Sequence, residues 1–298
     1  MRAAAILGLG CSANDLKPFQ TDASVECRIG LPTADDAVDA VLVFGGDGTI
    51  HRHLPQLVAL ALPVMIVPAG SGNDFARALG LKRVRDSLAA WKKFCADRSN
   101  VHAIDLGTVV ELGARSSGRE ALRLATHYFC CAASIGLDSD VARRANELPR
   151  WLRGHGGYVL SLMPALARFA AFRMKIHTND AAAKWTLSSD RPTMLAAFAN
   201  APLYGGGMKI APRAKIDDGL LDVCTIEGID AFRLFCLFPT IYSGRHLQIK
   251  EVHYLQAAAA RVETEHPMDV YADGEFVCRT PVEIGVGREA LKVIAPKS

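Results

Sequence analysis

Two short apolar runs early in the chain each end in a glycine-rich loop that leads into a helical stretch. Ala40–Phe44 is followed by Gly45-Gly-Asp-Gly48, and Pro63–Val67 is followed by Pro68-Ala-Gly-Ser-Gly72. After the first loop, apolar residues recur at the spacing of an amphipathic helix. Strand–loop–helix units in series predict a parallel sheet with helices packed on it. By the same signals we expect a strand at Ala3–Leu9 and helices at Phe75–Leu79 and Ser87–Ala96.

The pattern changes beyond residue 125 to short apolar runs separated by Gly, Asn-Asp and Asp-Asp turns. Such a series predicts an antiparallel sandwich or barrel. We therefore expect an α/β domain over residues 1–125 and a β-sandwich domain over residues 126–287. Strands are expected at Leu124–Ala132, Arg173–Thr178, Trp185–Leu187, Met194–Asn200, Leu220–Ile226, Ala260–Thr264, Met268–Ala272, Glu275–Arg279 and Val282–Val286, and helices at Asp138–Asn146, Tyr158–Phe172 and Ala231–Ser243.

Composition narrows the class of protein. At 298 residues the chain suits one large or two ordinary domains, and with 50% hydrophobic residues it can bury a core without disulfides. A net charge of only +3 does not indicate a nucleic-acid binder. The eight cysteines form no C-x-x-C pair and no zinc spacing, so we expect reduced cysteines in a cytoplasmic protein.

Two segments have the outline of an export signal or a membrane span. Met1–Cys11 combines an early arginine, a short apolar run and a cysteine, as a bacterial lipoprotein signal does. The run is short and Gly8 interrupts it, so a buried strand is the better interpretation. Tyr158–Met174 contains Pro164 and reaches Arg168 before the ~20 apolar residues that a span needs. We expect no transmembrane helix.

The first glycine loop has the composition of a phosphate site. Glycines let the backbone approach a ligand closely, and free N–H groups at a helix start attract anions. A plain strand–helix turn is the alternative, but three glycines and one aspartate within five residues favour the phosphate site. The loop comprises Gly45, Gly46, Asp47, Gly48 and Thr49.

The second loop follows one strand–helix unit later, so both loops should open at the same edge of a parallel sheet. Asp47 and Asp74 beside a phosphate site would suit a Mg²⁺ ion. Taken alone, Asn73-Asp74 also reads as a helix N-cap. The loop comprises Gly70, Ser71, Gly72, Asn73 and Asp74.

Neither loop is a Walker motif, since no G-x-x-x-x-G-K-[ST] occurs. At the N-terminus, Gly8-Leu-Gly10-Cys-Ser-Ala13 matches the looser dinucleotide fingerprint G-x-G-x-x-A. This match keeps a Rossmann oxidoreductase as a rival interpretation.

Several motifs, in order, resemble the diacylglycerol kinase catalytic-domain family, which includes bacterial lipid kinases and sphingosine kinases. The resemblance extends over roughly residues 40 to 294. It is carried by Gly45-Gly-Asp-Gly-Thr-Ile50, Pro68-Ala-Gly-Ser-Gly-Asn-Asp-Phe-Ala-Arg77, Asp105-Leu-Gly-Thr108, Ala133-Ser-Ile-Gly-Leu-Asp138, Gly205-Gly-Gly-Met-Lys-Ile-Ala-Pro-Arg-Ala-Lys215, Asp217-Asp-Gly-Leu-Leu-Asp222 and Asp273-Gly-Glu275.

The resemblance implies an ATP- and Mg²⁺-dependent lipid kinase that phosphorylates a diacylglycerol-like or sphingoid-like hydroxyl. It also implies that residues 288–298 return to the first domain. By the resemblance, Gly45 to Thr49 would hold the ATP phosphates and Ser71 would contact the nucleotide. Asp218 with the carbonyls of Lys215 and Leu220 would bind Mg²⁺, while Asp47, Asp74 and Asp105 would order the magnesium–water network. Asp273 and Glu275 would activate the lipid hydroxyl, with Glu275 as the first choice of base.

The Asp273-Gly-Glu275 motif has two interpretations from the residues alone. If the motif is extended, both carboxylates point to one face, because side chains alternate along a strand. A positioned carboxylate helps to remove the proton of a lipid hydroxyl, which is a poor nucleophile. The alternative is a tight turn with two solvated acids.

The chain departs from the family pattern at two places. Gly10-Cys-Ser-Ala-Asn14 stands where many members have Asn-Pro-x-Ser-Gly, and His51-Arg52 stands where they have Asn-Glu or His-Glu. Two rival functions remain. One is a nicotinamide-nucleotide kinase, which shares the Gly-Gly-Asp-Gly loop, although the Gly-Ser-Gly-Asn-Asp and Asp-Asp-Gly-Leu-Leu motifs argue against it. The other, suggested by the altered loop and Arg52, is a non-catalytic homologue that binds lipid or nucleotide.

A basic, aromatic stretch predicts contact with a membrane surface. Between Arg143 and Lys175 there are seven Lys or Arg residues and one acid, Glu147, with aromatic residues among them. This composition suits docking on anionic lipid, and an ordinary solvated helix is the alternative. We expect a lipid substrate, peripheral contact with the inner membrane face and no nucleic acid, and leave a homodimer open.

Overall fold

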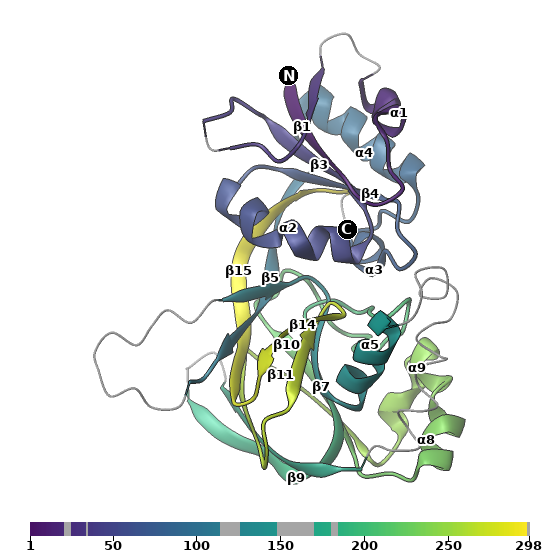
Figure 1. Ribbon diagram of the computed structural model, residues 1–298, viewed down its shortest axis with the longest axis vertical. Helices are drawn as coiled ribbons and strands as arrows, with labels where there is room; N and C mark the ends of the chain where they lie inside the picture. The colour runs from purple at the N-terminus through teal and green to yellow at the C-terminus, as the bar shows by residue number, and fades with distance from the viewer. Residues whose placement is uncertain (21–24, 34, 114–125, 148–169, 180–183, 297–298) are drawn as a thin grey trace, which may run out of the picture. The chain divides into compact units, whose positions relative to one another are not determined.

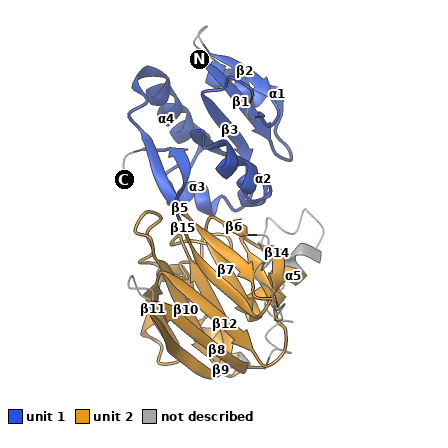
Figure 2. Ribbon diagram, turned by 90° about the vertical axis from the view of Figure 1, so that its left-hand side faces the viewer, with its two compact units in different colours: residues 1–105, 288–298 blue, residues 106–287 orange. Residues whose placement is uncertain are grey.

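The computed structural model describes residues 1–20, 25–33, 35–113, 126–147, 170–179 and 184–296. The chain forms two compact units, Met1–Asp105 with Arg288–Ser298, and Leu106–Gly287 (Figure 2). Two strands belong to both units, β5 (Val101–Glu111) and β15 (Val282–Ile294).

The first unit is a parallel sheet covered by helices, which confirms the predicted α/β class (Figure 1). The strands lie in the order β15-β4-β3-β1-β2. All residues of the two central strands are buried, as expected for parallel strands with both faces covered. The unit contains β1 (Arg2–Leu7), β2 (Glu26–Ile29), β3 (Ala40–Gly45), β4 (Val64–Pro68), α1 (Ala13–Leu16), the 3-10 helix η1 (Lys17–Gln20), α2 (Asp47–Leu60), α3 (Asp74–Ala78) and α4 (Val84–Asp97).

The helices of this unit pack by their apolar stripes. Leu54 and Leu57 of α2 and Trp91 and Phe94 of α4 are buried. The indole N–H of Trp91 donates to the carbonyl of Phe19 at 2.9 Å, which fixes η1 against α4.

The second unit is the predicted antiparallel β-sandwich. Its interior is a cluster of apolar side chains that includes Phe129, Ile176, Phe198, Val223 and Val262. A second apolar cluster joins the opposite side of β9 to the helices. The unit contains β6 (His127–Phe129), β7 (Ala132–Gly136), β8 (Phe172–Asn179), β9 (Trp185–Ala199), β10 (Leu221–Glu227), β11 (Val252–Ala257), β12 (Ala259–Thr264), β13 (Asp269–Ala272), β14 (Glu275–Arg279), α5 (Leu137–Glu147), α8 (Ala231–Leu237), α9 (Thr240–Ser243) and the 3-10 helix η2 (Arg245–Gln248).

The border between the units differs from the one expected from the sequence. The change of pattern indicated residue 126, whereas the compact units divide at Asp105/Leu106. The reason is that β6 pairs antiparallel with the far half of β5, with Gly107 opposite Phe129, so residues after Asp105 join the sandwich. The C-terminal return expected at residue 288 coincides with the second division, at Gly287/Arg288.

Several predicted elements have other bounds in the structure. The strand expected at Leu124–Ala132 is divided into β6 and β7 around Cys130-Cys131, and the two strands expected within 185–200 form the single strand β9. β2, β5 and β11 were not predicted as strands, since their apolar and polar residues mix. Most of the predicted helix Tyr158–Phe172 and most of the basic stretch fall outside the described residues. Phe172, the last residue of that predicted helix, begins the strand β8 instead. Within the described ranges, no helix is long and apolar enough to span a bilayer.

Candidate active site

The two glycine loops lie against each other at the carboxyl ends of neighbouring parallel strands. Gly45 of β3 pairs with Pro68 of β4, and the N–H of Ala69 donates to the carbonyl of Gly45 at 3.1 Å. A Cβ on Gly70 would lie 2.4 Å from the Cα of Gly46. Glycine is therefore required at this contact, because a side chain on Gly70 would push the loops apart.

The start of α2 offers backbone N–H groups to an anion. Gly46 is the N-cap, and no side chain caps the helix there. The first N–H groups of a helix lack intrahelical partners and, with the helix dipole, favour a phosphate. Gly48, in the first turn, is exposed. The geometry of this loop thus fits the phosphate site expected from its composition.

The side chain of Thr49 packs closely against Gly45 and Gly8. A Cβ on Gly45 or on Gly8 would lie 2.6 Å from the Thr49 hydroxyl oxygen. Gly8 is therefore explained by packing against Thr49. The element that follows the Gly8–Ala13 fingerprint is α1, a single turn of four residues, instead of the long helix of a dinucleotide-binding unit.

Asp47 fastens the first loop to the second. Its carboxylate accepts the N–H of Asp74 at 3.0 Å and the N–H of Phe75 at 3.1 Å, so it caps α3 from the neighbouring helix. Asn73 occupies the N-cap position but makes no side-chain cap bond, contrary to the simple interpretation of Asn73-Asp74. Its side chain instead bonds both the N–H and the carbonyl of Gly70, at 3.0 and 2.6 Å.

The other residues expected near the phosphates have distinct surroundings. Ser71 is exposed at the loop tip, and a Cβ on Gly72 would lie 2.8 Å from a carboxylate oxygen of Asp47. The carboxylate of Asp74 is buried and accepts from Arg77 at 2.7 Å. Asp105 is also buried and accepts the N–H of Glu289 at 2.7 Å, which ties the returning strand β15 to β5.

The Asp273-Gly274 pair forms a tight turn, so the extended interpretation was wrong. Both residues have positive φ, +50° and +85°, and Ala272 pairs with Glu275 across the turn. Asp-Gly is a favoured pair for such two-residue hairpin turns. Asp273 is not a solvated acid either. Its carboxylate accepts the N–H groups of the Cys130–Ala132 segment, at 2.7, 2.8 and 3.3 Å.

Glu275 contrasts with Asp273, two residues before it. It begins β14, and its side chain is exposed. Among the described residues, no hydrogen bond or ion pair of its carboxylate occurs, so both oxygens are open to a ligand. The turn thus places the hydrogen-bonded carboxylate of Asp273 and the exposed carboxylate of Glu275 at the same end of the hairpin.

The predicted magnesium residues lie on the loop before β10. Asp218 accepts the N–H of Leu220 at 3.1 Å through one oxygen, and Gly219 between them has a φ of +74°. In the described part of the chain, no group of three or more His, Cys, Asp or Glu side chains could hold a metal ion. One carboxylate with the carbonyls of Lys215 and Leu220 is nevertheless a hard-oxygen set that fits Mg²⁺, which keeps several water ligands.

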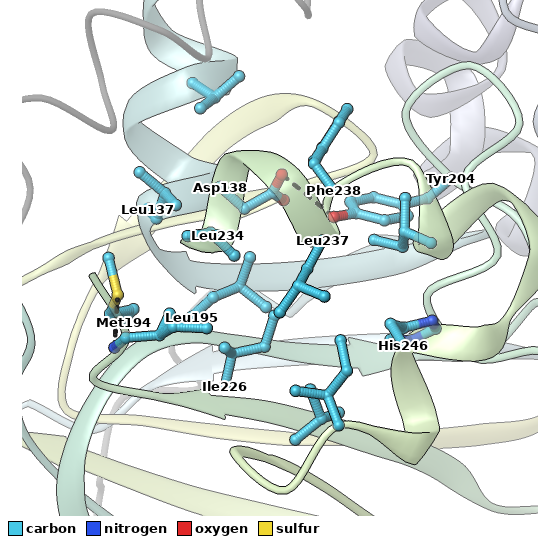
Figure 3. A pocket seen from close by; sticks show the side chains of 15 residues that line it. Leu137, Asp138, Met194, Leu195, Tyr204, Ile226, Leu234, Leu237, Phe238 and His246 are labelled. Carbon is cyan, nitrogen blue, oxygen red and sulfur yellow. Dashed lines mark hydrogen bonds between the residues drawn. The ribbon is translucent and has the colours of Figure 1, made fainter. Parts of the chain in front are cut away.

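An apolar cavity lies in the second unit between the sandwich and its helices (Figure 3), with a volume of about 60 Å³. We call it the apolar cavity. Most of its lining is aliphatic or aromatic, and the polar exceptions are Asp138, Tyr204 and His246. It is lined by Leu137, Asp138, Val141, Met194, Leu195, Tyr204, Ile226, Ile229, Leu234, Leu237, Phe238, Ile241, His246, Ile249 and Val252.

Asp138 and Tyr204 form one polar end of this cavity. Figure 3 shows them facing each other, and the Tyr204 hydroxyl donates to Asp138 at 3.2 Å. Burial raises the pKa of Asp138 to about 6, against the lowering effect of hydrogen bonds from Ser134 and Tyr204. Asp138 ends the family motif Ala133–Asp138, from which no role for it was expected, and no local signal in the sequence marks Tyr204, 66 residues away.

Comparison with known proteins shows two matching domains and related kinases. Residues 13–109 match the diacylglycerol kinase catalytic domain, and residues 131–295 match the YegS C-terminal NAD kinase beta sandwich-like domain. A diacylglycerol kinase of Mycobacterium tuberculosis (strain CDC 1551 / Oshkosh) is 36% identical over 262 residues, 87% of this chain and 77% of the relative.

Two solved structures share the fold. A Bacillus anthracis (strain Sterne) crystal structure, provisionally named a diacylglycerol kinase, matches with a TM-score of 0.72 and 20% identity, over 99% of this chain and 96% of that one. An NAD kinase from Archaeoglobus fulgidus in complex with ATP matches with a TM-score of 0.54 and 14% identity, over 99% and 93%. The matching domains, the order of the motifs and the Mycobacterium relative together show that the chain belongs to the diacylglycerol kinase catalytic-domain family of lipid kinases.

Proposed function

We propose that this lipid kinase transfers the γ-phosphate of ATP to the hydroxyl of a lipid whose apolar chain places a few methylene groups in the apolar cavity. The observation that carries the choice of acceptor is the cavity itself, an aliphatic space with Asp138 and Tyr204 at a polar end. A diacylglycerol or a sphingoid base has the matching division into apolar chain and polar head. A nicotinamide nucleotide, the acceptor of the rival kinase, has no apolar chain to occupy such a space.

On the nucleotide side, the proposal assigns ATP phosphates to the first glycine loop. The uncapped start of α2 supplies backbone N–H groups, and Gly46 leaves the backbone accessible. Asp47 ties the first loop to the second by accepting the N–H groups of Asp74 and Phe75, and Asn73 fixes the second loop internally by its bonds to Gly70. Ser71, exposed at the tip of the second loop, is assigned to the nucleotide.

Magnesium is assigned to Asp218 with the carbonyls of Lys215 and Leu220. The bond from Leu220 N–H to one Asp218 oxygen orients the carboxylate, so the other oxygen points away from that bond. When bound, Mg²⁺ would neutralise charge on the phosphates during transfer. Asp105 and Asp74 are buried and bonded within the first unit, and we assign them to holding the fold around the loops rather than to direct metal contact.

For removal of the hydroxyl proton we assign Glu275 as the base. A base needs an oxygen that can approach the lipid hydroxyl, and the exposed carboxylate of Glu275 meets that condition. Asp273 already accepts three N–H groups. We therefore assign Asp273 to positioning, since it fixes the turn that presents Glu275.

A transfer assay with γ-labelled ATP tests the proposal. The panel contains diacylglycerol, phosphatidylglycerol, ceramide, a sphingoid base and a nicotinamide nucleotide, each with Mg²⁺ and with a chelator. We expect the labelled phosphate to appear on a lipid when Mg²⁺ is present and not to appear when the chelator removes it. Label on the nicotinamide nucleotide alone would overturn the lipid assignment, and binding of ATP without transfer to any acceptor would favour a non-catalytic homologue.

A further inference from the structure

Helix α8 carries apolar side chains on two opposite sides. Leu234 and Leu237 face inward and line the apolar cavity (Figure 3). Phe232 and Phe235, three residues apart and so on one helix face, are 78% and 46% exposed. A globular protein normally keeps its large aromatic side chains away from water, and two on one turn call for a partner.

The segment around α8 carries slightly more cations than acids. Residues 230–251 contain three Lys or Arg residues and two acids, Asp230 and Glu251. Arg233 is bonded to Glu251, at 2.6 and 3.2 Å, and Lys250 lies 3.7 Å from the same carboxylate, while Arg245 is exposed. Tyr242 of α9 is 42% exposed and packs edge-on against Phe238, with ring centroids 6.0 Å apart. Aromatic rings with cations around them are typical of segments that lie in the interface of a bilayer.

We propose that Phe232, Phe235 and Tyr242 form a membrane-insertion face, which docks this kinase on a bilayer that contains anionic lipid. The inference rests on the proposed function, because α8 would then separate the bilayer from the cavity that receives the lipid chain. This arrangement explains why one short helix is apolar on both sides. The inner side lines the cavity, and the outer side enters the acyl boundary while the cations meet lipid phosphates.

The test compares the unchanged chain with the double variant Phe232→Ser/Phe235→Ser, first by vesicle co-sedimentation without ATP. Both side chains are exposed, so the fold should survive, and circular dichroism checks this. Vesicles of phosphatidylcholine with phosphatidylglycerol should bind the unchanged chain, and the double variant should bind at least about tenfold more weakly, because two aromatic rings lose their apolar burial. Leu187→Ser, which removes a side chain that is 56% exposed on β9, is the matched control and should bind normally.

A kinetic arm separates docking from catalysis. The double variant should show a raised KM for lipid presented in vesicles and an unchanged kcat for a short-chain lipid dispersed in solution. Equal vesicle binding by the double variant and the unchanged chain would overturn the inference, as would a change in oligomeric state without a change in vesicle binding. If the unchanged chain phosphorylates no lipid but binds vesicles through these residues, the proposed function fails and the docking face stands.

Discussion

Replacing Asp138 by asparagine should change how the stability of this protein depends on pH. Asp138 lies at the polar end of the apolar cavity, is 4% exposed, and is bonded to the Tyr204 hydroxyl. Its pKa is raised from 3.8 to about 6, chiefly by burial. That rise corresponds to about 3 kcal/mol between the two protonation states. Asparagine keeps a carbonyl oxygen for Tyr204 but carries no charge at any pH.

The sign follows from the raised pKa. Below pH 3.8 the carboxyl is protonated in both the folded and the unfolded chain, so burial costs nothing extra. Between 3.8 and about 6 the unfolded chain ionises first, and the folded state loses stability as the pH rises. Above about 6 the loss is complete. The asparagine variant has no such loss, so its stability relative to the unchanged chain should increase by about 2–3 kcal/mol from about pH 4 to about pH 8.

Urea unfolding of both chains at the two pH values measures this difference. The contributions of the other titrating groups cancel in the comparison, because both chains contain the same groups. Asp140→Asn, on the same helix, is a control of opposite sign. Burial alone would raise the pKa of Asp140, but hydrogen bonds from Arg144 and Arg143 hold it below its ordinary value. Removing that carboxylate should therefore cost more stability at about pH 8 than at about pH 4. An Asp138→Asn difference that is the same at both pH values would refute the argument.

Four further predictions concern the loops and the hairpin. Gly70→Ala should reduce ATP-dependent transfer by about 10²-fold or more, since its Cβ would lie 2.4 Å from the Cα of Gly46 and the phosphate loop must shift. Asp47→Ala should lower the free energy of unfolding by about 1–2 kcal/mol and reduce transfer, because α3 loses its cap. Glu275→Gln should lower kcat by about 10²–10⁴-fold with little change in stability or ATP affinity, whereas Asp273→Asn should also cost about 1–3 kcal/mol of stability, since the acceptor of three N–H groups is weakened.

Labelled-ATP transfer, calorimetric ATP binding and urea unfolding check these predictions. Ser71→Ala, at an exposed loop tip, is the stability control for the loop variants and should unfold like the unchanged chain. Normal transfer by Gly70→Ala would show that the contact between the loops is not required. Full turnover by Glu275→Gln together with loss in a stably folded Asp273→Asn would move the base assignment to Asp273.

The sequence predicted the parts of the fold that local patterns encode. Apolar runs closed by glycine loops predicted β3, α2 and β4, because a buried parallel strand needs an unbroken apolar run and its loop needs glycine. The alternation of short strands predicted the sandwich. The motifs predicted the family. Strands of mixed composition, such as β2 and β11, escaped prediction because their partners, rather than their own residues, place them in the sheet.

The sequence by itself determined two units of different architecture, a pair of glycine loops and a set of acidic residues. The tertiary structure decided which of those acids accept hydrogen bonds from the backbone of distant segments. Asp273 bonds the N–H groups of a segment 141–143 residues away, and Asp47 caps a helix 27 residues away. The apolar cavity, with its Asp138–Tyr204 pair, likewise exists only where distant segments meet. A local pattern records whether a segment is helical or extended and which face is apolar, but a hydrogen bond across a long separation depends on how the chain folds back.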